Sequence, residues 1–173
     1  VVVTESPLQV QVQGKNLAVL MRTPGDDDVL TLGFLFSEGL IRGVDDVRSL
    51  RHCDTADLDE DDEADWDWDD GQHVMQVVLH DDTLLQQRQK RATLTSSSCG
   101  MCGKALLDEV ASACAPVPAD GAAVSVAWLA DAVRQMQDAQ PVFHKTGACH
   151  AAASFHVDDD KLVPDALYED VGR

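Results

Sequence analysis

Strict alternation of apolar and polar residues opens the chain and predicts its first strand. Residues 8–13 read LQVQVQ, and a Gly14-Lys15 turn leads to a second apolar run at residues 17–21. The two segments therefore predict a β-hairpin. The apolar run at residues 73–80 predicts another strand, and the long segment 83–94 is its predicted partner strand.

Two more strands are predicted near the end of the sequence. Residues 148–157 and 162–168 are separated by three aspartates at 158–160, which favour a turn. On the first of these strands His150 lies on the opposite face from Cys149, because successive strand side chains alternate. Residues 44–53 predict either a short strand or a loop.

Helical periodicity predicts three helices, over residues 27–38, 104–114 and 126–139. Aspartates precede the first, Gly39 is its predicted C-terminal cap, and Ser125 is the predicted N-cap of the third. The apolar positions predicted to face a core are Leu30, Phe34, Leu35, Leu40, Leu129, Val133 and Met136. Hairpins and helices together predict an α/β fold, with a mixed sheet flanked by helices and an N-terminal part that contains the first hairpin.

Charge narrows the function classes. The sequence has 13 Lys and Arg against 31 Asp and Glu, a formal net charge of −18, which argues against a broad basic face for nucleic acid. No long apolar run or secretory signal is present, so we expect a cytoplasmic protein without a membrane span. Eleven acids fall within residues 54–70 and predict a solvated loop, either a variable insertion or an interaction segment. The sequence thus predicts one domain over residues 1–173 with three parts, which are the hairpin and helix of 1–53, the acidic loop 54–71, and the sheet, cysteine segment and helices of 72–173.

Five cysteines are present, and their odd number and irregular spacing favour reduced thiols. Cys99 and Cys102 form a CxxC pair in a segment of small residues. The helix predicted just after them, together with Lys104, favours a thiolate at Cys102. From the residues alone the pair fits a sulfur-transfer or redox centre, a zinc site completed by scattered ligands, or a purely structural loop.

The segment TSSSCGMCGK at residues 95–104 resembles the cysteine loop of the FdhD/NarQ family, the formate dehydrogenase accessory sulfurtransferases. Four further blocks resemble the family in the same order. They are ESPL at 5–8, MRTPGDD with GFLFSEG between 21 and 39, FHKTGACHAA at 143–152 and EDVGR at 169–173. Two departures are Ala148, where the family often has a second Gly, and the end of the chain at Arg173, where the family continues into a further C-terminal portion.

The resemblance implies a fold similar to that of cytidine deaminases, here without the C-terminal portion. The deaminase reaction is not implied, because the sequence lacks the His-x-Glu and Pro-Cys-x-x-Cys signature of zinc deaminases. His150 is followed by two alanines, and the cysteine pair comes before it without a proline. No resident metal is therefore expected.

The resemblance further implies a sulfurtransferase. It would take a persulfide from a cysteine desulfurase and pass the sulfur to the molybdenum or tungsten bis-guanine-dinucleotide cofactor of formate dehydrogenase. Cys99 and Cys102 match the family's sulfur-carrying pair. Cofactor contacts are expected from cations and tight loops of the matched blocks: Arg22, Thr23, Gly25, Lys104, Lys145, Thr146, Gly147, His150 and Arg173.

Alternatives remain open at this point. The chain could belong to a cofactor-binding chaperone that moves no sulfur, or to a zinc-stabilised CxxC module. His150 is either a cofactor contact or a hydrogen-bonded core histidine. A homodimer is compatible with the expected fold.

Overall fold

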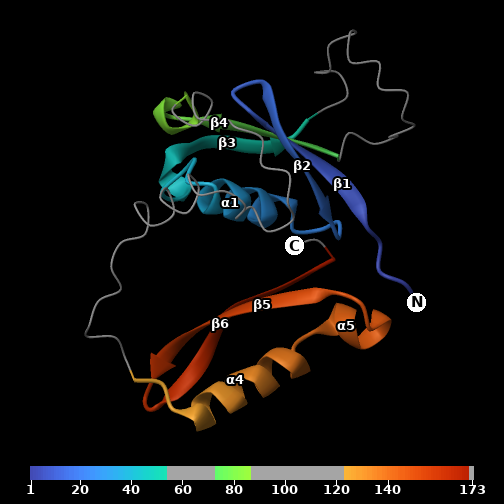
Figure 1. The fold of residues 1–173 in the computed structure, drawn as a ribbon, viewed down its shortest axis with the longest axis vertical. Helices are drawn as coiled ribbons and strands as arrows, with labels where there is room; N and C mark the ends of the chain where they lie inside the picture. Colours follow the sequence, from blue (N-terminus) through green and yellow to red (C-terminus); the bar gives the residue numbers. More distant parts are fainter. Residues whose placement is uncertain (54–72, 87–122, 172–173) are drawn as a thin grey trace, which may run out of the picture. The chain divides into compact units, whose positions relative to one another are not determined.

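The computed structural model of the chain describes residues 1–53, 73–86 and 123–171 (Figure 1). The chain divides into two compact units. Of the described residues, the first unit holds 1–53, 73–86, 142–150 and 170–171, and the second holds 123–141 and 151–169. The acidic segment, the cysteine loop and the predicted helix at 104–114 lie outside the described residues. The fold is mixed α/β, as the sequence predicts.

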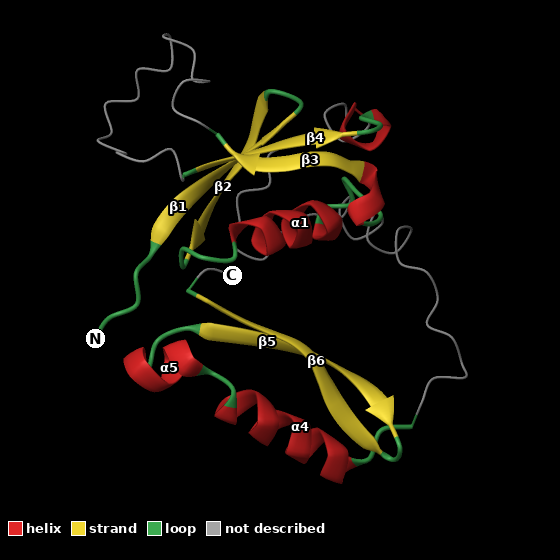
Figure 2. Ribbon diagram, turned by 180° about the vertical axis from the view of Figure 1, so that it is seen from behind, coloured by secondary structure: helices red, strands yellow, loops and turns green. Residues whose placement is uncertain are grey.

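A four-stranded mixed sheet in the order β2-β1-β4-β3 is the frame of the first unit (Figure 2). β1 (Ser6–Val12) and β2 (Lys15–Arg22) form the predicted antiparallel hairpin. β4 (Val74–Leu79) runs parallel to β1 and antiparallel to β3 (Val47–His52). Strands from both sides of the acidic segment therefore share one sheet.

The hairpin turn lies at Gln13 and Gly14, one residue earlier than the sequence predicts. Both residues have positive φ angles, 53° and 72°, as the central pair of a type I′ turn requires. This turn type is favoured in hairpins because its twist matches that of the strands. Gly14 adopts the left-handed conformation without the steric cost of a Cβ atom.

Helix α1 (Asp27–Ser37) covers one face of this sheet (Figure 2). Leu35 and Leu40 are buried, as predicted, whereas Leu30 and Phe34 are half-buried. The core cluster consists of Val10, Val12, Leu35, Leu40, Ile41, Val77, Leu79 and Leu85. The helix ends at Ser37, and Gly39 follows the C-cap residue Glu38 with a φ of 67°, which suits a glycine after a helix end. The predicted boundaries are therefore confirmed to within a residue.

The segment before β4 combines the two alternatives left open for residues 44–53. A short 3-10 turn, η1 (Val44–Asp46), leads directly into β3. The backbone N–H of His80, which follows β4, donates to the Asp46 carbonyl at 2.9 Å. That hydrogen bond ties the turn to the end of β4.

The strand predicted at residues 83–94 is wrong over the part that the structure describes, because residues 83–86 are helical. The Asp81 carboxylate accepts hydrogen bonds from the hydroxyl and the N–H of Thr83, at 2.5 and 2.9 Å. Both hydrogen bonds lower the pKa of Asp81, and the bond from the hydroxyl has the larger effect. This local cap starts a helical turn in competition with strand pairing, and Leu85 is buried in the core.

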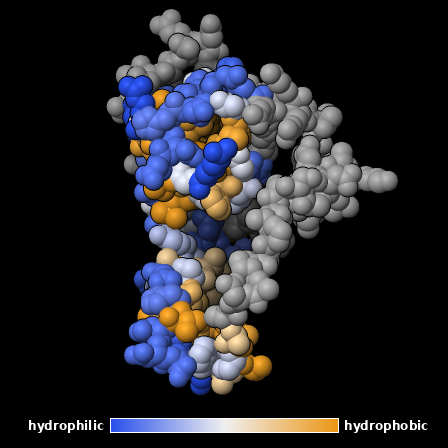
Figure 3. Space-filling model, turned by 90° about the vertical axis from the view of Figure 1, so that its left-hand side faces the viewer, coloured by the Kyte–Doolittle hydropathy of each residue, from blue (hydrophilic) through white to orange (hydrophobic). Residues whose placement is uncertain are grey.

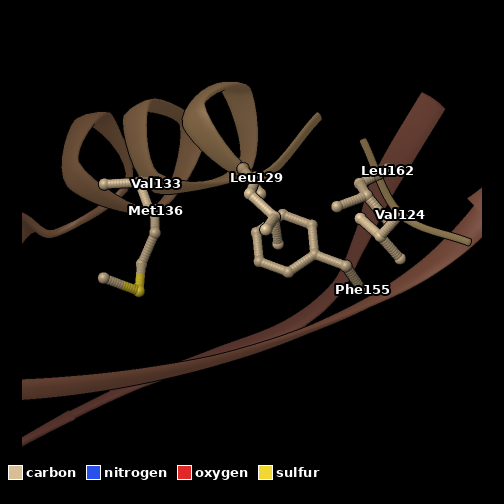
Figure 4. Close-up of a pocket in the computed structure, with 7 residues that line it drawn as sticks. Val124, Leu129, Val133, Met136, Phe155 and Leu162 are labelled. Carbon is tan, nitrogen blue, oxygen red and sulfur yellow. The ribbon is translucent and has the colours of Figure 1, made fainter. Parts of the chain in front are cut away.

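The second unit contains α4 (Val126–Asp138) and, except for the end residues His150 and Asp170, the hairpin of β5 (His150–Asp158) and β6 (Lys161–Asp170). His150 and Asp170 belong to the first unit. The hairpin confirms the prediction, and its turn residues Asp159 and Asp160 have φ angles of 40° and 61°. Helix and hairpin enclose an apolar groove of about 330 Å³ (Figure 4), lined by Val124, Leu129, Ala132, Val133, Met136, Phe155 and Leu162.

Three of these groove residues, Leu129, Val133 and Met136, confirm the apolar face predicted for the helix. Leu129 and Val133 nevertheless leave 52% and 50% of their surface exposed. In the side view of Figure 3, apolar residues accordingly appear at the surface between hydrophilic ones.

A short helix, α5 (Pro141–Thr146), follows α4 and was not predicted. From the sequence, Pro141 indicates only that the helix predicted over 126–139 has ended. Proline also suits the first position of a helix, where its missing N–H has no intrahelical partner to lose.

The N-cap of α4 gives a stability prediction. The Ser125 hydroxyl accepts a hydrogen bond from the Trp128 N–H at 3.1 Å. We expect Ser125→Ala to lower the free energy of unfolding of the second unit by about 1 kcal/mol, measured by amide hydrogen exchange in α4. Ser125→Asp is the matched control, since it keeps a capping oxygen and should retain the protection. Equal protection in the Ala variant would contradict the cap.

Candidate functional site

The first unit contains every described residue that the sequence predicts for the site. They are Arg22, Thr23, Gly25, Lys145, Thr146, Gly147 and His150. The predicted sulfur-carrying pair Cys99 and Cys102, together with Lys104 and Arg173, lies outside the described residues. The geometry that follows therefore concerns the part of the predicted site assigned to cofactor contacts.

Arg22 ends β2 and is buried, with 1% of its surface exposed. Its Nε lies 2.8 Å from Asp27 Oδ1, and its Nη2 donates to Asp27 Oδ2 at 3.0 Å. The remaining terminal nitrogen donates to the Ser6 hydroxyl. The Nη2 contact is a charge-assisted hydrogen bond, and the Nε contact adds a close approach of the two opposite charges. The guanidinium thus faces its own fold, and a direct cofactor contact by Arg22 stays a prediction.

Asp27 is the first residue of α1 and joins several elements at one point. Its carbonyl accepts the Thr31 hydroxyl at 2.7 Å, within the helix. His52 Nε2, at the end of β3, lies 3.5 Å from Asp27 Oδ2. The pair of Arg22 and Asp27 therefore connects the start of β1 with the ends of β2 and β3 and the first turn of α1.

Thr23, the next residue along the chain, makes two reciprocal hydrogen bonds with the end of β6. Its N–H donates to Asp170 Oδ2 at 3.2 Å, and its Oγ1 accepts the Val171 N–H at 3.1 Å. The two bonds span 147 and 148 residues of sequence. They join the block at 21–27 to the block at 169–173, two segments that the sequence predicts for one site. We call this pair of hydrogen bonds the Thr23 clasp.

Gly25 lies in the loop between β2 and α1. Its φ is 144°, a conformation that side-chain-bearing residues rarely adopt. An added Cβ would meet no atom within 4 Å. A glycine therefore suits this position because of its backbone conformation and not because space is short.

The block at 143–152 forms a helix end followed by a strand. The Thr146 hydroxyl donates to the Val142 carbonyl at 2.8 Å and accepts the Ala148 N–H at 3.2 Å. The N–H of Gly147, whose φ is 68°, donates to the Phe143 carbonyl at 2.7 Å. Thr146 and Gly147 thus cap α5, whose last turn also carries the exposed Lys145. Phosphate contacts by these residues stay predictions.

His150 is exposed at the start of β5, which excludes the core-histidine alternative. Exposure alternates along this strand as predicted, and the exposed face also carries His156, whose Nδ1 lies 2.6 Å from Asp165 Oδ1 on β6. Cys149 is half-buried, on the other face from His150. Among residues 1–53, 73–86 and 123–171, no group of three Cys, His, Asp or Glu could hold a metal.

Sequence reasoning missed Asp170 and the partner role of Asp27. Asp27 was interpreted only as one of three acids at a helix start. Asp170 was recognised as part of a block without a role of its own. A signal for both was available, because each is an acid inside a matched block that also contains a residue predicted for the site.

None of the helices in the described part of the chain has the length and apolar character needed to cross a bilayer.

Known sequences similar to this chain match it over the residues that contain these blocks. The sequence model of the FdhD/NarQ family matches residues 3–173. The sulfur carrier protein FdhD of Nocardia farcinica is 39% identical over 170 residues, 98% of this chain and 56% of the relative. That of Mycolicibacterium paratuberculosis is 41% identical over 179 residues, 99% of this chain and 60% of the relative. The chain thus spans less than two thirds of these curated relatives.

A solved structure shares the fold. The crystal structure of a candidate formate dehydrogenase accessory protein from Desulfotalea psychrophila matches with a TM-score of 0.59 and 17% identity. The match covers 99% of this chain and 54% of the other. At this identity the likeness concerns the fold alone.

Proposed function

The chain belongs to the FdhD/NarQ family, and from that premise we propose that it carries sulfur as a persulfide on Cys99 and Cys102. The sulfur comes from a cysteine desulfurase and goes to the molybdenum or tungsten bis-guanine-dinucleotide cofactor of formate dehydrogenase. The observation that carries the proposal is the family match over residues 3–173, which includes the whole CxxC segment. The match to relatives named sulfur carrier proteins supports it.

The loading step is a thiol–persulfide exchange. A cysteine thiolate of the pair attacks the outer sulfur of the desulfurase persulfide, and a new S–S bond forms on this chain. The S–S bond of the donor breaks, and the desulfurase cysteine leaves as a thiolate. The sulfane sulfur is transferred from the desulfurase cysteine to a cysteine of this chain without net oxidation or reduction.

The release step uses the second thiol of the pair. Its thiolate attacks the inner sulfur of the persulfide, so that a disulfide forms between Cys99 and Cys102 and hydrosulfide leaves for the cofactor. The disulfide then needs a dithiol reductant before another cycle. A CxxC spacing suits this step because the two sulfurs are close in sequence and can form a small disulfide loop.

Cofactor contacts are proposed for the first unit. The support is that all seven described residues of the predicted contact set belong to this unit. The Thr23 clasp also joins two of the matched blocks there. Lys145 and His150 are exposed and supply polar groups that can meet an anionic nucleotide.

Mass spectrometry tests the proposal. After incubation with a cysteine desulfurase and cysteine, we expect the chain to gain the mass of sulfur on a peptide that contains Cys99 and Cys102. A thiol reductant should remove the gain. Cys149→Ser is the matched control and should still be loaded. A chain that binds guanine nucleotide but gains no sulfur on this pair would instead be a cofactor-binding chaperone.

A further inference from the structure

The Thr23 clasp uses the backbone N–H that a tight loop at Thr23 would offer to a phosphate, and it also uses the Thr23 hydroxyl. The backbone N–H is engaged by the Asp170 carboxylate, and Oγ1 accepts the Val171 N–H. A phosphate approaching the Thr23 N–H would have to displace a carboxylate that already occupies the acceptor position. Thr23 is therefore better suited to hold another segment of the chain than to contact the cofactor.

Arg22, the residue just before Thr23, fixes the position of the clasp. Arg22 is held by the buried carboxylate of Asp27 and by the Ser6 hydroxyl. Its side chain therefore cannot turn without leaving a charge unpaired in the core. Because Thr23 follows directly, its N–H and Oγ1 have a defined position at the end of β2. The clasp thus attaches the end of β6 to a rigid part of the first unit.

On these grounds we propose that Asp170 is a positioning residue. Acting through Thr23, it holds the segment of Asp170 and Val171, which belongs to the first unit, against the loop between β2 and α1. It thereby shapes the surface that binds the guanine-nucleotide part of the acceptor cofactor. This rests on the proposed function and deepens it. It also changes the role of Thr23 from a ligand contact to the acceptor and donor of an internal clasp.

The matched variants follow from the two hydrogen bonds. Thr23→Val replaces the hydroxyl by a methyl group of similar size and removes the acceptor for the Val171 N–H. Thr23→Ser keeps the hydroxyl and is its control. Asp170→Ala removes the acceptor for the Thr23 N–H, and Asp170→Asn keeps an acceptor oxygen without the charge.

GDP binding, measured by calorimetry on the folded variants, is the main readout, and sulfur loading by a cysteine desulfurase is the second. We expect Thr23→Val and Asp170→Ala to weaken GDP binding by about tenfold, as loss of an ordered hydrogen bond suggests. Thr23→Ser and Asp170→Asn should lie closer to the parent. Sulfur loading is the separate readout for the cysteine pair, since loading takes place there.

Three results would overturn the proposal. Tighter GDP binding by Asp170→Ala would mean that Thr23 is itself a ligand and that Asp170 competes with the phosphate. Unchanged GDP affinity with a lowered melting temperature would make the clasp purely structural. A parent protein that is loaded with sulfur but binds no GDP would remove the surface that Asp170 is proposed to shape, and would leave sulfur carriage standing. Absence of sulfur loading with the expected GDP pattern would instead overturn sulfur carriage and support the positioning role.

Discussion

Asp27→Asn is expected to lower the free energy of unfolding of the first unit by about 3–5 kcal/mol, because it leaves the Arg22 guanidinium buried without its counter-charge. The side chains of Arg22 and Asp27 are only 2% and 8% exposed, so water cannot replace the lost partner. Amide hydrogen exchange of β1 and β4 at increasing urea concentration reports on this unit and measures the change.

A double variant separates the cost of an unpaired charge from the value of the pair itself. Arg22→Met combined with Asp27→Leu removes both charges and keeps apolar volume in the core. Buried ion pairs replaced in this way are often neutral or even stabilising, so the double variant should be more stable than Asp27→Asn alone. A double variant that loses as much stability as Arg22→Met alone and Asp27→Leu alone lose together would show that the pair is not energetically coupled.

Local signals account for most of the fold that could be predicted from the sequence. The first hairpin, α1, α4 and the β5-β6 hairpin each carry their own periodicity and their own turn or cap residues. Ser125 caps α4 as expected because an N-cap needs only a side-chain oxygen and an N–H three residues later. Such features are encoded within about four residues of sequence, the distance over which periodicity and capping act.

The two secondary-structure predictions that failed share one physical origin. The sequence predicts a strand over 83–94 because this segment is long and polar. In the structure the Asp81 carboxylate accepts two hydrogen bonds from Thr83, and a helical turn begins there. Pro141 was interpreted as a stop although it is also a suitable first residue of a helix. In both places two local structures compete, and the outcome depends on a side-chain hydrogen bond or a tertiary contact.

The residues of the candidate site could be predicted from the family blocks, but the contacts among them could not. Arg22 and Thr23 were singled out because they lie in a matched block. Periodicity cannot show that Asp27 neutralises one of them, or that Asp170 holds the other from 147 residues away. Contacts of this kind depend on how the chain folds, so they become visible only in the structure.

Replacement of the two cysteines is the prediction with the largest expected effect on function. Cys99→Ala combined with Cys102→Ala should abolish sulfur loading by a cysteine desulfurase completely, because sulfane sulfur cannot be carried without a thiol. The loss is read as the absence of added sulfur in the mass spectrum. Cys53 is buried at 4% exposure and should not substitute, and Cys149→Ala is the matched control that should still be loaded. Sulfur mapped to Cys149 in the double variant would contradict the assignment.

The single variants then assign an order to the pair. The sequence predicts a helix directly after Cys102, and the helix dipole and Lys104 favour its thiolate. Cys102 is therefore expected to accept sulfur first, so Cys102→Ala should lose loading. Cys99→Ala should be loaded but should hold its persulfide, since the thiol that releases hydrosulfide is missing. The opposite pattern would exchange the two roles, whereas full loading and release in both single variants would mean that neither step needs the pair and would contradict release through a Cys99–Cys102 disulfide.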